Sequence, residues 1–383
     1  MKAVVPARRS PILLTAWLIA VSFGPWGGGC EGDEDIVAVD NTQDYVVTSA
    51  AELASLSGLT AVTGDLTIEK SVDLTSLQGL ESLTKVQGNL YIRNNSNLEN
   101  LEGLNNLATI GKSFRIASND VLASVAACTS LTSVKNFYIE DNGALPNLDG
   151  LDSLLSIGGE FHIRNNNVLT NLDALKHITL VNGDLFINRN DKLASLEGLR
   201  SLTRVNGNLG ICANDVLVNL NGLRNLTSVW GVWIGFEVVE RTGGTDYFYS
   251  GNDALESVQG LNKLTSIGGR LHICTNTSLT SLDGLNNITS IADELWIHNG
   301  MLTSLQGLEN LTSLGGTLHV FSNYELSQLG LNDLDFVGGS FWILNNSKLP
   351  TSLVTTLRDQ VLAGGGIGED IVICGNQDGS PCD

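Results

Sequence analysis

Basic residues and long apolar segments are both scarce in this chain. Its 21 lysines and arginines stand against 41 aspartates and glutamates, which gives a formal net charge of −20. Because so acidic a body repels phosphate backbones and anionic lipid surfaces, we expect no nucleic-acid partner. Beyond the apolar run at residues 12–23, no stretch reaches membrane-spanning length, and twelve residues are too short to cross a bilayer stably. We therefore expect a chain that is tethered near its N-terminus or secreted.

Recognised catalytic motifs are also lacking. The sequence contains no nucleophile elbow, no phosphate-binding glycine loop and no metalloprotease motif. We therefore expect no enzymatic activity, no catalytic residue, no metal and no cofactor.

The first 29 residues have the pattern of an export signal. Lys2, Arg8 and Arg9 precede the apolar run, and three glycines precede Cys30. A cysteine after small residues at the end of a signal resembles the processing site of bacterial lipoproteins, which implies lipidation of Cys30 and a membrane anchor. Ordinary cleavage nearby, with Cys30 left in a loose tether, is the alternative. The two arginines also resemble a twin-arginine signal.

The predicted domain organisation follows from this start. A signal peptide at 1–29 precedes an acidic tether at 30–44 and one continuous repeat domain at 45–383. Lipidation would place the protein in a bacterial cell envelope or on the outer-membrane surface, and without it the protein would be secreted.

A phrase of the form Gly-x-Leu-x-Ile-x-x-Asn returns about every 24 residues, as in Gly88, Leu90, Ile92 and Asn95. A period of this length indicates a solenoid, in which each coil stacks on the next. We predict a mostly β solenoid of about 13 coils, with parallel sheets and short capping helices at the ends. The positions aligned on the isoleucine are Ile68, Ile92, Ile116, Ile139, Ile163, Ile187, Ile211, Ile234, Ile273, Ile297, Val320, Ile343 and Ile373.

Apolar residues within one coil first alternate and then step by three, which predicts a short strand followed by tight turns rather than an amphipathic α-helix. A glycine recurs before a leucine, and we expect it to take a positive φ or to permit a close backbone approach. These glycines are Gly103, Gly150, Gly198, Gly222, Gly260, Gly284 and Gly307.

An asparagine follows the isoleucine by three residues in most coils. Stacked in register, its amide is expected to face inward at a turn and to bond backbone groups that the turn leaves unpaired. The positions are Asn95, Asn119, Asn142, Asn166, Asn190, Asn214, Asn276, Asn323, Asn346 and Asn376.

Both ends of the repeat depart from the pattern. Residues 45–47 are predicted to form a capping strand, followed by a helix with a capping box made by Ser49 and Glu52. Residues 352–362 are predicted to form a helix over the last core edge, and 371–376 a final coil.

The repeat resembles the receptor L-domain family. The phrase from Leu90 to Leu98, with Ile92 and Asn95, carries the resemblance, together with Leu-Thr-Ser-Ile-Gly-Gly at 264–269. Over residues 45–376 the resemblance implies a right-handed β-helix related to leucine-rich repeats, with a ligand bound on the main sheet. The chain has no Cys-rich module, kinase or transmembrane helix, and its coils run on without a break, so receptor signalling is not implied.

One side chain of each strand, between the leucine and the isoleucine, should point away from the core. Nine of these thirteen residues are aromatic or histidine, and neighbours should lie about 4.8 Å apart. We interpret them as a contact surface for a protein or a glycan, since exposed aromatic rows commonly mark interfaces. Sideways packing of strand aromatics is the alternative. The predicted ligand-binding residues are Tyr91, Tyr138, His162, Phe186, Trp233, His272, Trp296, His319 and Trp342.

An insertion interrupts the coil that contains Trp233. Residues 235–250 alternate around Gly243 and Gly244, which predicts a β-hairpin. Insertions in repeat proteins tend to lie on the binding face, so we expect a contact role; a plain loop is the alternative.

The cysteines divide into three kinds. Cys374 and Cys382 close a short terminal loop and are predicted to form a disulfide. Cys128 takes an inward leucine position and is predicted to be a buried thiol. Cys212 and Cys274 occupy equivalent positions two coils apart, about 9.6 Å, beyond the roughly 7 Å that a disulfide can bridge.

Two further clusters of side chains can each be interpreted in more than one way. His272, Cys274 and His298 should be outward neighbours, where they could bind zinc or simply be surface residues of the ladder. Glu160 and Asp184 should be lateral neighbours, where a carboxylate pair could serve acid–base chemistry or hold a cation, or simply be solvated.

The sequence therefore favours a non-enzymatic binding or adhesion scaffold at the cell surface or in the periplasm. Its expected partner is an unidentified protein or glycan, with the membrane reached only through a lipid on Cys30. A passive envelope spacer and, less favoured, a polysaccharide-active enzyme are the alternatives.

Overall fold

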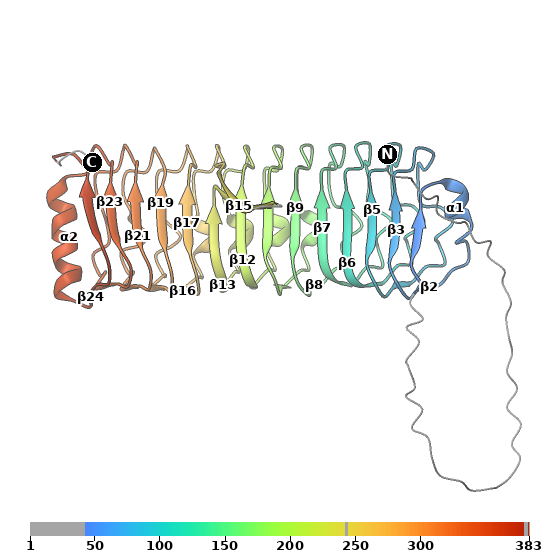
Figure 1. The fold of residues 1–383 in the computed structure, drawn as a ribbon, viewed down its shortest axis with the longest axis horizontal. Helices are drawn as coiled ribbons and strands as arrows, with labels where there is room; N and C mark the ends of the chain where they lie inside the picture. The colour runs from blue at the N-terminus through green and yellow to red at the C-terminus, as the bar shows by residue number, and fades with distance from the viewer. Residues whose placement is uncertain (1–42, 242–243, 379–381, 383) are drawn as a thin grey trace, which may run out of the picture. The chain divides into compact units, whose positions relative to one another are not determined.

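The computed structural model describes residues 43–241, 244–378 and 382, and in the hairpin 236–249 only the backbone. Residues 41–383 form one compact unit, a parallel β-solenoid of about twelve turns (Figure 1). The thirteen aligned positions all fall in one row of strands, and β1 extends this row by one strand at its N-terminal end. Among the described residues no helix is both long and apolar enough to cross a membrane. Cys30 and the predicted signal and tether lie outside the described residues, apart from the last two tether positions.

The main sheet is a continuous row of parallel strands. Its register is regular, with Ile163 beside Ile187 and Ile187 beside Ile211, so the predicted alignment of coils is confirmed. The strands are β1 (Tyr45–Val47), β3 (Leu66–Glu69), β5 (Leu90–Arg93), β6 (Thr109–Ala117), β7 (Ser133–Glu140), β9 (Phe161–Arg164), β11 (Leu185–Asn188), β12 (Arg204–Cys212), β13 (Ser228–Ile234), β17 (Leu271–Cys274), β19 (Leu295–His298), β21 (Leu318–Phe321), β23 (Phe341–Leu344) and β25 (Ile371–Cys374).

A second row of two-residue strands precedes the main row in each coil. In β6, β7, β12 and β13 one longer strand runs through both rows, and the register shifts at the corner. The short strands are β2 (Ala61–Val62), β4 (Lys85–Val86), β8 (Ser156–Ile157), β10 (Leu180–Val181), β16 (Ser266–Ile267), β18 (Ser290–Ile291), β20 (Ser313–Leu314), β22 (Phe336–Val337) and β24 (Gly366–Ile367). Four 3-10 turns lie on the remaining side: Asp173–Leu175, Glu197–Leu199, Asn221–Leu223 and Gln259–Leu261.

The core consists of columns of aliphatic side chains that repeat from coil to coil. Leu90 and Ile92 are fully buried, as are their equivalents in the other coils except the last, where Ile371 is exposed and Ile373 is half-buried. Where phenylalanine replaces the first leucine, the rings of Phe114, Phe137 and Phe161 stack nearly parallel, with centroids 5.0 and 5.5 Å apart. Because one coil cannot bury these residues alone, the coils depend on their neighbours for stability.

The recurring glycine fulfils both predicted roles. Gly103 has a φ of 114°, which disfavours a side chain. Gly222 lies in a 3-10 turn, and a Cβ there would be 1.8 Å from the carbonyl oxygen of Leu196 in the preceding coil. The coils are therefore packed backbone against backbone at this side.

Helices cover both ends of the solenoid, as predicted. Helix α1 (Ala50–Ala54) begins at Ser49, whose hydroxyl accepts a hydrogen bond from the Glu52 amide; the Glu52 carboxylate bonds the amide of Thr48 instead of that of Ser49. Helix α2 (Thr351–Ala363) covers the other end, where Val354 and Val361 are buried.

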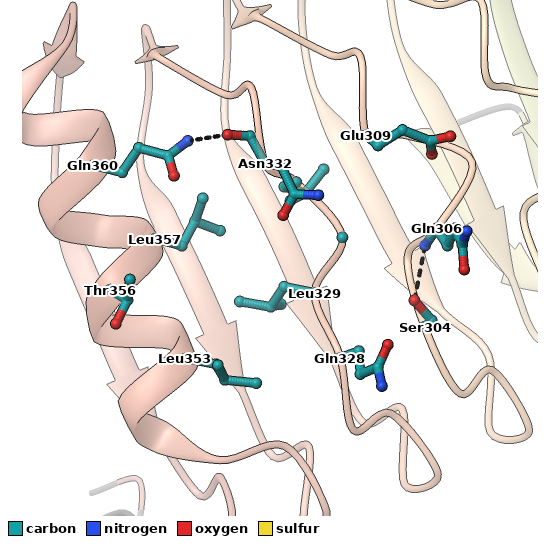
Figure 2. A pocket seen from close by; sticks show the side chains of 12 residues that line it. Ser304, Gln306, Glu309, Gln328, Leu329, Asn332, Leu353, Thr356, Leu357 and Gln360 are labelled. Carbon is teal, nitrogen blue, oxygen red and sulfur yellow. Dashed lines mark hydrogen bonds between the residues drawn. The ribbon is translucent and has the colours of Figure 1, made fainter.

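A cavity of about 510 Å³ lies between α2 and the last turns (Figure 2). Leu353 and Leu357 line it on the helix side, and Leu329 lies opposite. Gln360 donates hydrogen bonds to the carbonyl oxygens of Asn332 and Leu334, which fixes the helix to the last turn.

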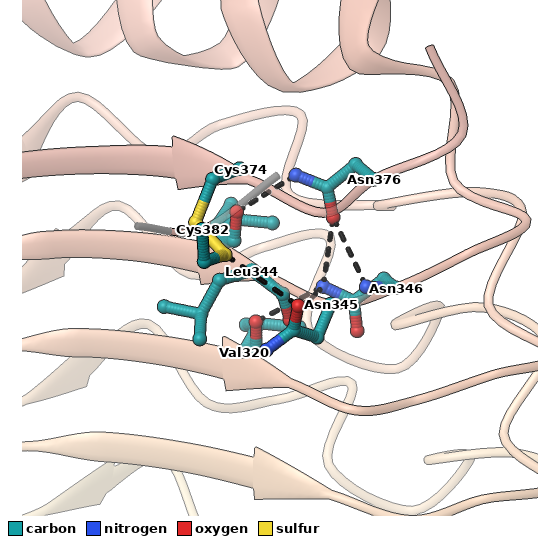
Figure 3. The surroundings of a disulfide bond; sticks show 8 residues. Val320, Leu344, Asn345, Asn346, Cys374, Asn376 and Cys382 are labelled. Carbon is teal, nitrogen blue, oxygen red and sulfur yellow. Dashed lines mark hydrogen bonds between the residues drawn. A yellow bond between two sulfur atoms is a disulfide. The ribbon is translucent and has the colours of Figure 1, made fainter. Parts of the chain in front are cut away.

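A disulfide closes the C-terminal loop (Figure 3). Cys374, at the end of β25, bonds to Cys382, with Cα atoms 5.1 Å apart. Next to it, Asn376 accepts the Asn346 amide proton and extends the asparagine column to the last coil.

The insertion is a two-stranded antiparallel hairpin, as predicted. Strand β14 (Phe236–Arg241) pairs with β15 (Gly244–Tyr249), from Phe236 beside Tyr249 to Arg241 beside Gly244. It leaves the solenoid directly after β13 and returns before Asn252, so it interrupts the coil without breaking the stack.

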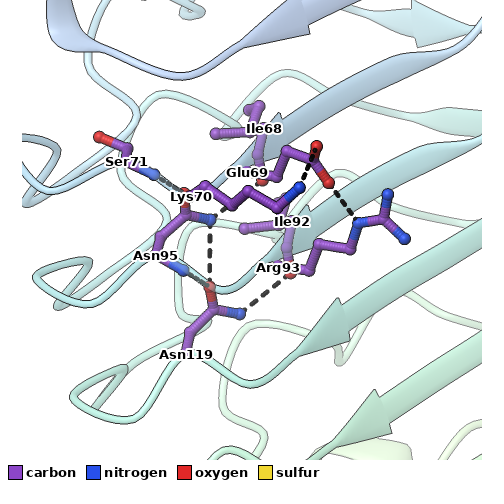
Figure 4. A network of polar contacts seen from close by, with 8 residues as sticks. All are labelled: Ile68, Glu69, Lys70, Ser71, Ile92, Arg93, Asn95 and Asn119. Carbon is purple, nitrogen blue, oxygen red and sulfur yellow. Dashed lines mark hydrogen bonds and ion pairs between the residues drawn. The ribbon is translucent and has the colours of Figure 1, made fainter. Parts of the chain in front are cut away.

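A buried asparagine ladder runs the length of the solenoid (Figure 4). Asn95 accepts the Ser71 amide proton at 3.1 Å, donates to the Ile68 carbonyl at 3.0 Å and donates to the Asn119 side chain at 3.1 Å. The predicted inward amides are thus confirmed. Two members were missed by sequence spacing, Asn252 behind the hairpin and Asn299 in a coil one residue shorter, and both are fully buried in the ladder.

The residue before a member of the ladder takes a left-handed backbone conformation in most coils, and Lys70, before Ser71, does the same in the first coil. Non-glycine residues do so at Lys70, Asn94, Ser118, Asp141, Asn165, Arg189, Ala213, Thr275, Ser322 and Asn345. This conformation costs roughly 1–2 kcal/mol for a residue with a side chain. The bonds of the ladder asparagine, which tie together three coils, offset that cost at each turn.

Candidate functional site

The predicted contact residues lie in one column of the main sheet. Their register is continuous: Tyr138 is beside His162, His162 beside Phe186, and Trp233 beside His272. On the C-terminal side the column continues through Trp296, His319 and Trp342. The order of this aromatic column was thus predicted correctly from the sequence.

The N-terminal part of the aromatic column is a chain of ring contacts. The ring centroids of Tyr138 and His162 are 5.1 Å apart, edge to face, and those of His162 and Phe186 are 5.0 Å apart. Tyr91 is separated from this chain by Arg115, whose guanidinium lies 5.9 Å from the centroid of the Tyr138 ring.

Gly210 lets the aromatic column continue across a coil that carries no ring. Phe186 and Trp233 flank it, and their rings stack at 5.7 Å with an interplanar angle of 17°. Since strands two coils apart are separated by about 9.6 Å, the two rings must lean toward each other over the glycine. A Cβ at Gly210 would lie 2.4 Å from the Phe186 ring.

The C-terminal part forms a denser cluster. Trp296 and His319 have ring centroids 4.6 Å apart, and His319 meets Trp342 edge to face at 5.3 Å. A second outward column adds Phe321, whose centroid is 4.4 Å from that of His319 and 4.4 Å from that of His298. The main-sheet face is therefore most aromatic over β19, β21 and β23.

Sideways packing covers much of the aromatic column. Tyr138, Phe186, Trp296 and Trp342 are only partly exposed, and His272 is 3 % exposed. The sideways packing that was the alternative interpretation is therefore present, because rings at this spacing cover one another. What remains accessible is the outer edge of a rigid row of rings.

Burial favours the neutral form of His162, His298 and His319 on this face. Desolvation lowers the pKa of His319 to about 4 and also lowers the pKa of His162 and His298. At neutral pH these rings are therefore neutral aromatics, and the aromatic column carries little positive charge.

Polar groups at the edge of the sheet orient some of the rings. The Tyr138 hydroxyl donates to Glu160 at 2.7 Å, and burial together with this bond raises the tyrosine pKa. His272 lies 3.4 Å from Glu294, and this contact lowers the pKa of the carboxyl group. Each of these aromatic side chains thus contacts a carboxylate that directly precedes the neighbouring strand.

Glu160 and Asp184 each have a separate partner. Asp184 accepts hydrogen bonds from the backbone and side-chain amides of Asn208, at 2.7 and 3.2 Å, while Glu160 binds Tyr138. Each carboxylate therefore binds its own partner at the edge of the sheet.

The predictions for the burial of Cys128 and for disulfide pairing are confirmed, whereas the predicted exposure of Cys274 is wrong. Cys128 is buried, which raises the pKa of its thiol to about 12, and Cys212 and Cys274 form no disulfide with each other. Cys274 and His272 were expected on the surface and are instead buried; the His272 ring lies against that of Trp296, with centroids 5.4 Å apart. Within the described ranges, no group of three or more His, Cys, Asp or Glu residues is arranged to hold a metal ion.

One exposed residue of this face was not identified from the sequence. Trp230 is 57 % exposed and lies at the corner of β13, three residues before Trp233. The sequence signal that could have identified it is a tryptophan at the second variable position of the Leu-Thr-x-Val-x-Gly phrase, where other coils carry small or polar residues.

Comparison with known proteins supports one assignment. The family described as receptor L domain matches residues 35–127 and 258–360, which together make up just over half of the chain. No curated protein matches the chain. The unmatched central residues continue the same coils in the same register. The chain belongs to the receptor L domain family.

Proposed function

We propose that the protein is a binding and adhesion scaffold whose contact surface is the outer face of the main sheet. Receptor L domains are non-enzymatic ligand-binding domains, which supports a binding role in general. The observation that carries the proposal is the unbroken contact from Tyr138 to Trp233 and from His272 to Trp342. Rigid, partly exposed aromatic side chains are the residues that dominate interfaces, since they lose little conformational entropy on binding.

The surroundings of the aromatic column favour a partner that is not strongly anionic. The chain has a net charge of −20, and Glu140, Glu160 and Glu294 lie beside the rings. Such a surface repels polyanions and favours neutral or basic partners. A neutral glycan and a basic protein surface are both compatible with this negative charge.

We also propose that the protein is exported and anchored through a lipid on Cys30, which the signal-like residues 1–29 support. Mass spectrometry of the mature N-terminus should find Cys30 as the first residue with a lipid attached. A mature protein that begins elsewhere, or an unmodified Cys30, would show ordinary secretion.

Replacement of Trp296 and Trp342 by alanine should weaken adhesion at least about tenfold, or ~1.4 kcal/mol, because two interface anchors are removed. Retention of the purified protein on a glycan array and on immobilised cell-envelope fractions measures the effect. The matched control replaces Val121 and Val168, exposed apolar residues of the turns, by alanine. Equal retention of both folded variants would reduce the column to a structural feature of a passive spacer.

A further inference from the structure

Trp230 differs from the residues at the same corner of the other coils. These residues follow the inward valine, isoleucine or leucine of the short strand and are Thr63, Gln87, Gly111, Lys135, Gly158, Asn182, Asn206, Gly268, Ala292, Gly315, Gly338 and Gly368. Trp230 is the one aromatic residue in this set, and more than half of its surface is open to solvent. A single exposed apolar residue is common on protein surfaces, so the case for a ligand at Trp230 rests on the groups that surround its open indole.

The indole of Trp230 rests on a pair of glycines in the next coil. A Cβ at Gly268 would lie 3.1 Å from Cε3 of the indole, and a Cβ at Gly269 would lie 2.8 Å from its Nε1. The two glycines thus meet opposite ends of the ring system, which places the ring along the glycine backbone. One side of the indole is supported by main chain, and the rest of it stays open.

A groove of about 510 Å³ adjoins this platform. Trp230 and Trp233 line it together with Asn208, Arg270 and Asp293. A volume of this size is within the range of pockets that hold small ligands. Because Trp233 also stacks on Phe186, the groove opens onto the aromatic column described above.

The polar groups of the groove are held in place. Arg270 Nε donates to Asp293 at 2.9 Å and lies 3.5 Å from Glu294, while both side chains of the Arg270–Asp293 pair remain about 45 % exposed. Asn208 is fixed by its bonds to Asp184. The Asn208 amide, the Arg270 guanidinium and the Asp293 carboxylate therefore lie beside the exposed indole of Trp230. Because their own hydrogen bonds hold them in place, they need not change conformation when a ligand binds.

This combination matches the chemistry of a sugar ring. A pyranose has an apolar C–H face that packs on an aromatic ring and a rim of hydroxyl groups that both donate and accept hydrogen bonds. Planar amide, carboxylate and guanidinium groups provide the complementary donors and acceptors. The carboxylates of Asp293 and Glu294 outnumber the single guanidinium of Arg270, and the chain has a net charge of −20. Both facts disfavour the binding of negatively charged uronic or sulfated sugars.

We infer that the Trp230 groove is a binding subsite for neutral saccharides, in which Trp230 stacks on the sugar ring and Arg270, Asp293 and Asn208 bind its hydroxyl groups. The inference rests on the proposed function, because it assigns a ligand class to one part of the same face. A polypeptide bound at the groove is the competing occupant and is an outcome of the test below.

The test uses the full chain and defined probes: hexamers of glucose in α- and β-linkages, of mannose and of N-acetylglucosamine, with polygalacturonate and heparin as anionic comparisons. Calorimetry and tryptophan fluorescence measure binding. At least one neutral hexamer should bind, Trp230→Ala should raise its Kd at least about tenfold, and Trp230→Phe should retain part of the affinity. Arg270→Gln should also weaken binding. The control, Tyr324→Ala, removes an exposed aromatic side chain that belongs neither to the groove nor to the aromatic column, and it should leave Kd unchanged.

Three results would overturn the inference: no neutral hexamer binds at millimolar concentration, Trp230→Ala binds as well as the parent with an unchanged fold, or a polyanion binds more tightly. If the Trp296/Trp342 variant still loses retention on envelope fractions in those cases, the proposed function stands and only the subsite fails. If Trp230→Ala instead abolishes capture of a basic protein partner, the groove belongs to a protein contact.

Discussion

Replacing Asn166 by leucine is expected to destabilise the protein by about 2–6 kcal/mol. Its side chain accepts the Asn142 amide proton at 3.2 Å and donates to the Ile139 carbonyl at 2.9 Å, and all of these groups are buried. A leucine fills the space but leaves at least these two backbone groups without a partner, at about 1–3 kcal/mol each. The left-handed turn at Asn165 also loses the bonds that offset its strain.

Urea denaturation followed by circular dichroism measures this effect. Asn167→Leu is the matched control, because it makes the same chemical change at the neighbouring exposed position and should alter stability by less than about 0.5 kcal/mol. Similar midpoints for the two variants would show that the asparagine ladder adds nothing to stability and that packing alone holds the turns.

Replacement of Gly222 by alanine should cost at least about 3 kcal/mol, although only one methyl group is added. That carbon would lie 1.8 Å from the carbonyl oxygen and 2.1 Å from the carbonyl carbon of Leu196. Since both atoms are backbone, no side chain can rotate away and the two coils must separate. Overpacking commonly costs 1–3 kcal/mol, and a clash with the backbone exceeds the usual case.

The control for this variant is Gly143→Ala. No atom lies within 4 Å of a Cβ at Gly143, and its φ is not in the left-handed region, so alanine should be neutral or slightly stabilising. Thermal unfolding of both variants gives the comparison. A Gly222→Ala protein that melts with the parent would mean that the coils are further apart than the structure places them.

Periodicity in the sequence was sufficient to predict which residues share a column. Leucine, isoleucine and asparagine recur at fixed offsets because each coil repeats the same turns, so the strand register and the order from Tyr138 to Trp342 follow from counting. The spacing did not identify two ladder asparagines, because the distance along the chain from the isoleucine to the asparagine differs in their coils. Asn252 lies behind the hairpin, and Asn299 follows its isoleucine by two residues instead of three.

Side-chain exposure could not be predicted in the same way. His272 and Cys274 occupy outward positions, yet both are buried, and the ring of Trp296 in the adjacent strand packs against that of His272. The lean of Phe186 and Trp233 over Gly210 depends on three coils at once. Nor did the repeat identify Trp230, whose platform is made by glycines of the following coil. Such features arise from contacts between coils, which a single repeat does not contain.

Under the proposed function, the aromatic column has a structural and a binding role together. Its ring contacts join neighbouring strands of the sheet, while its outer edge and the Trp230 groove would present rigid aromatic surface to a partner. The same packing that reduces exposure also fixes the rings, and fixed groups lose less entropy on binding.

The central claim, one uninterrupted stack of coils in register, is tested most directly by a spin-label distance. Ser96 and Ser347 follow equivalent ladder asparagines and are exposed, and ten coil steps separate them. At about 4.8 Å a step, labels on cysteines at the two positions should give a narrow distribution near 48 Å, while the native Cys128, Cys212 and Cys274 stay buried. A broad distribution, or a distance well below 48 Å, would contradict the account, because the chain would then divide into separate lobes and no continuous aromatic face would exist.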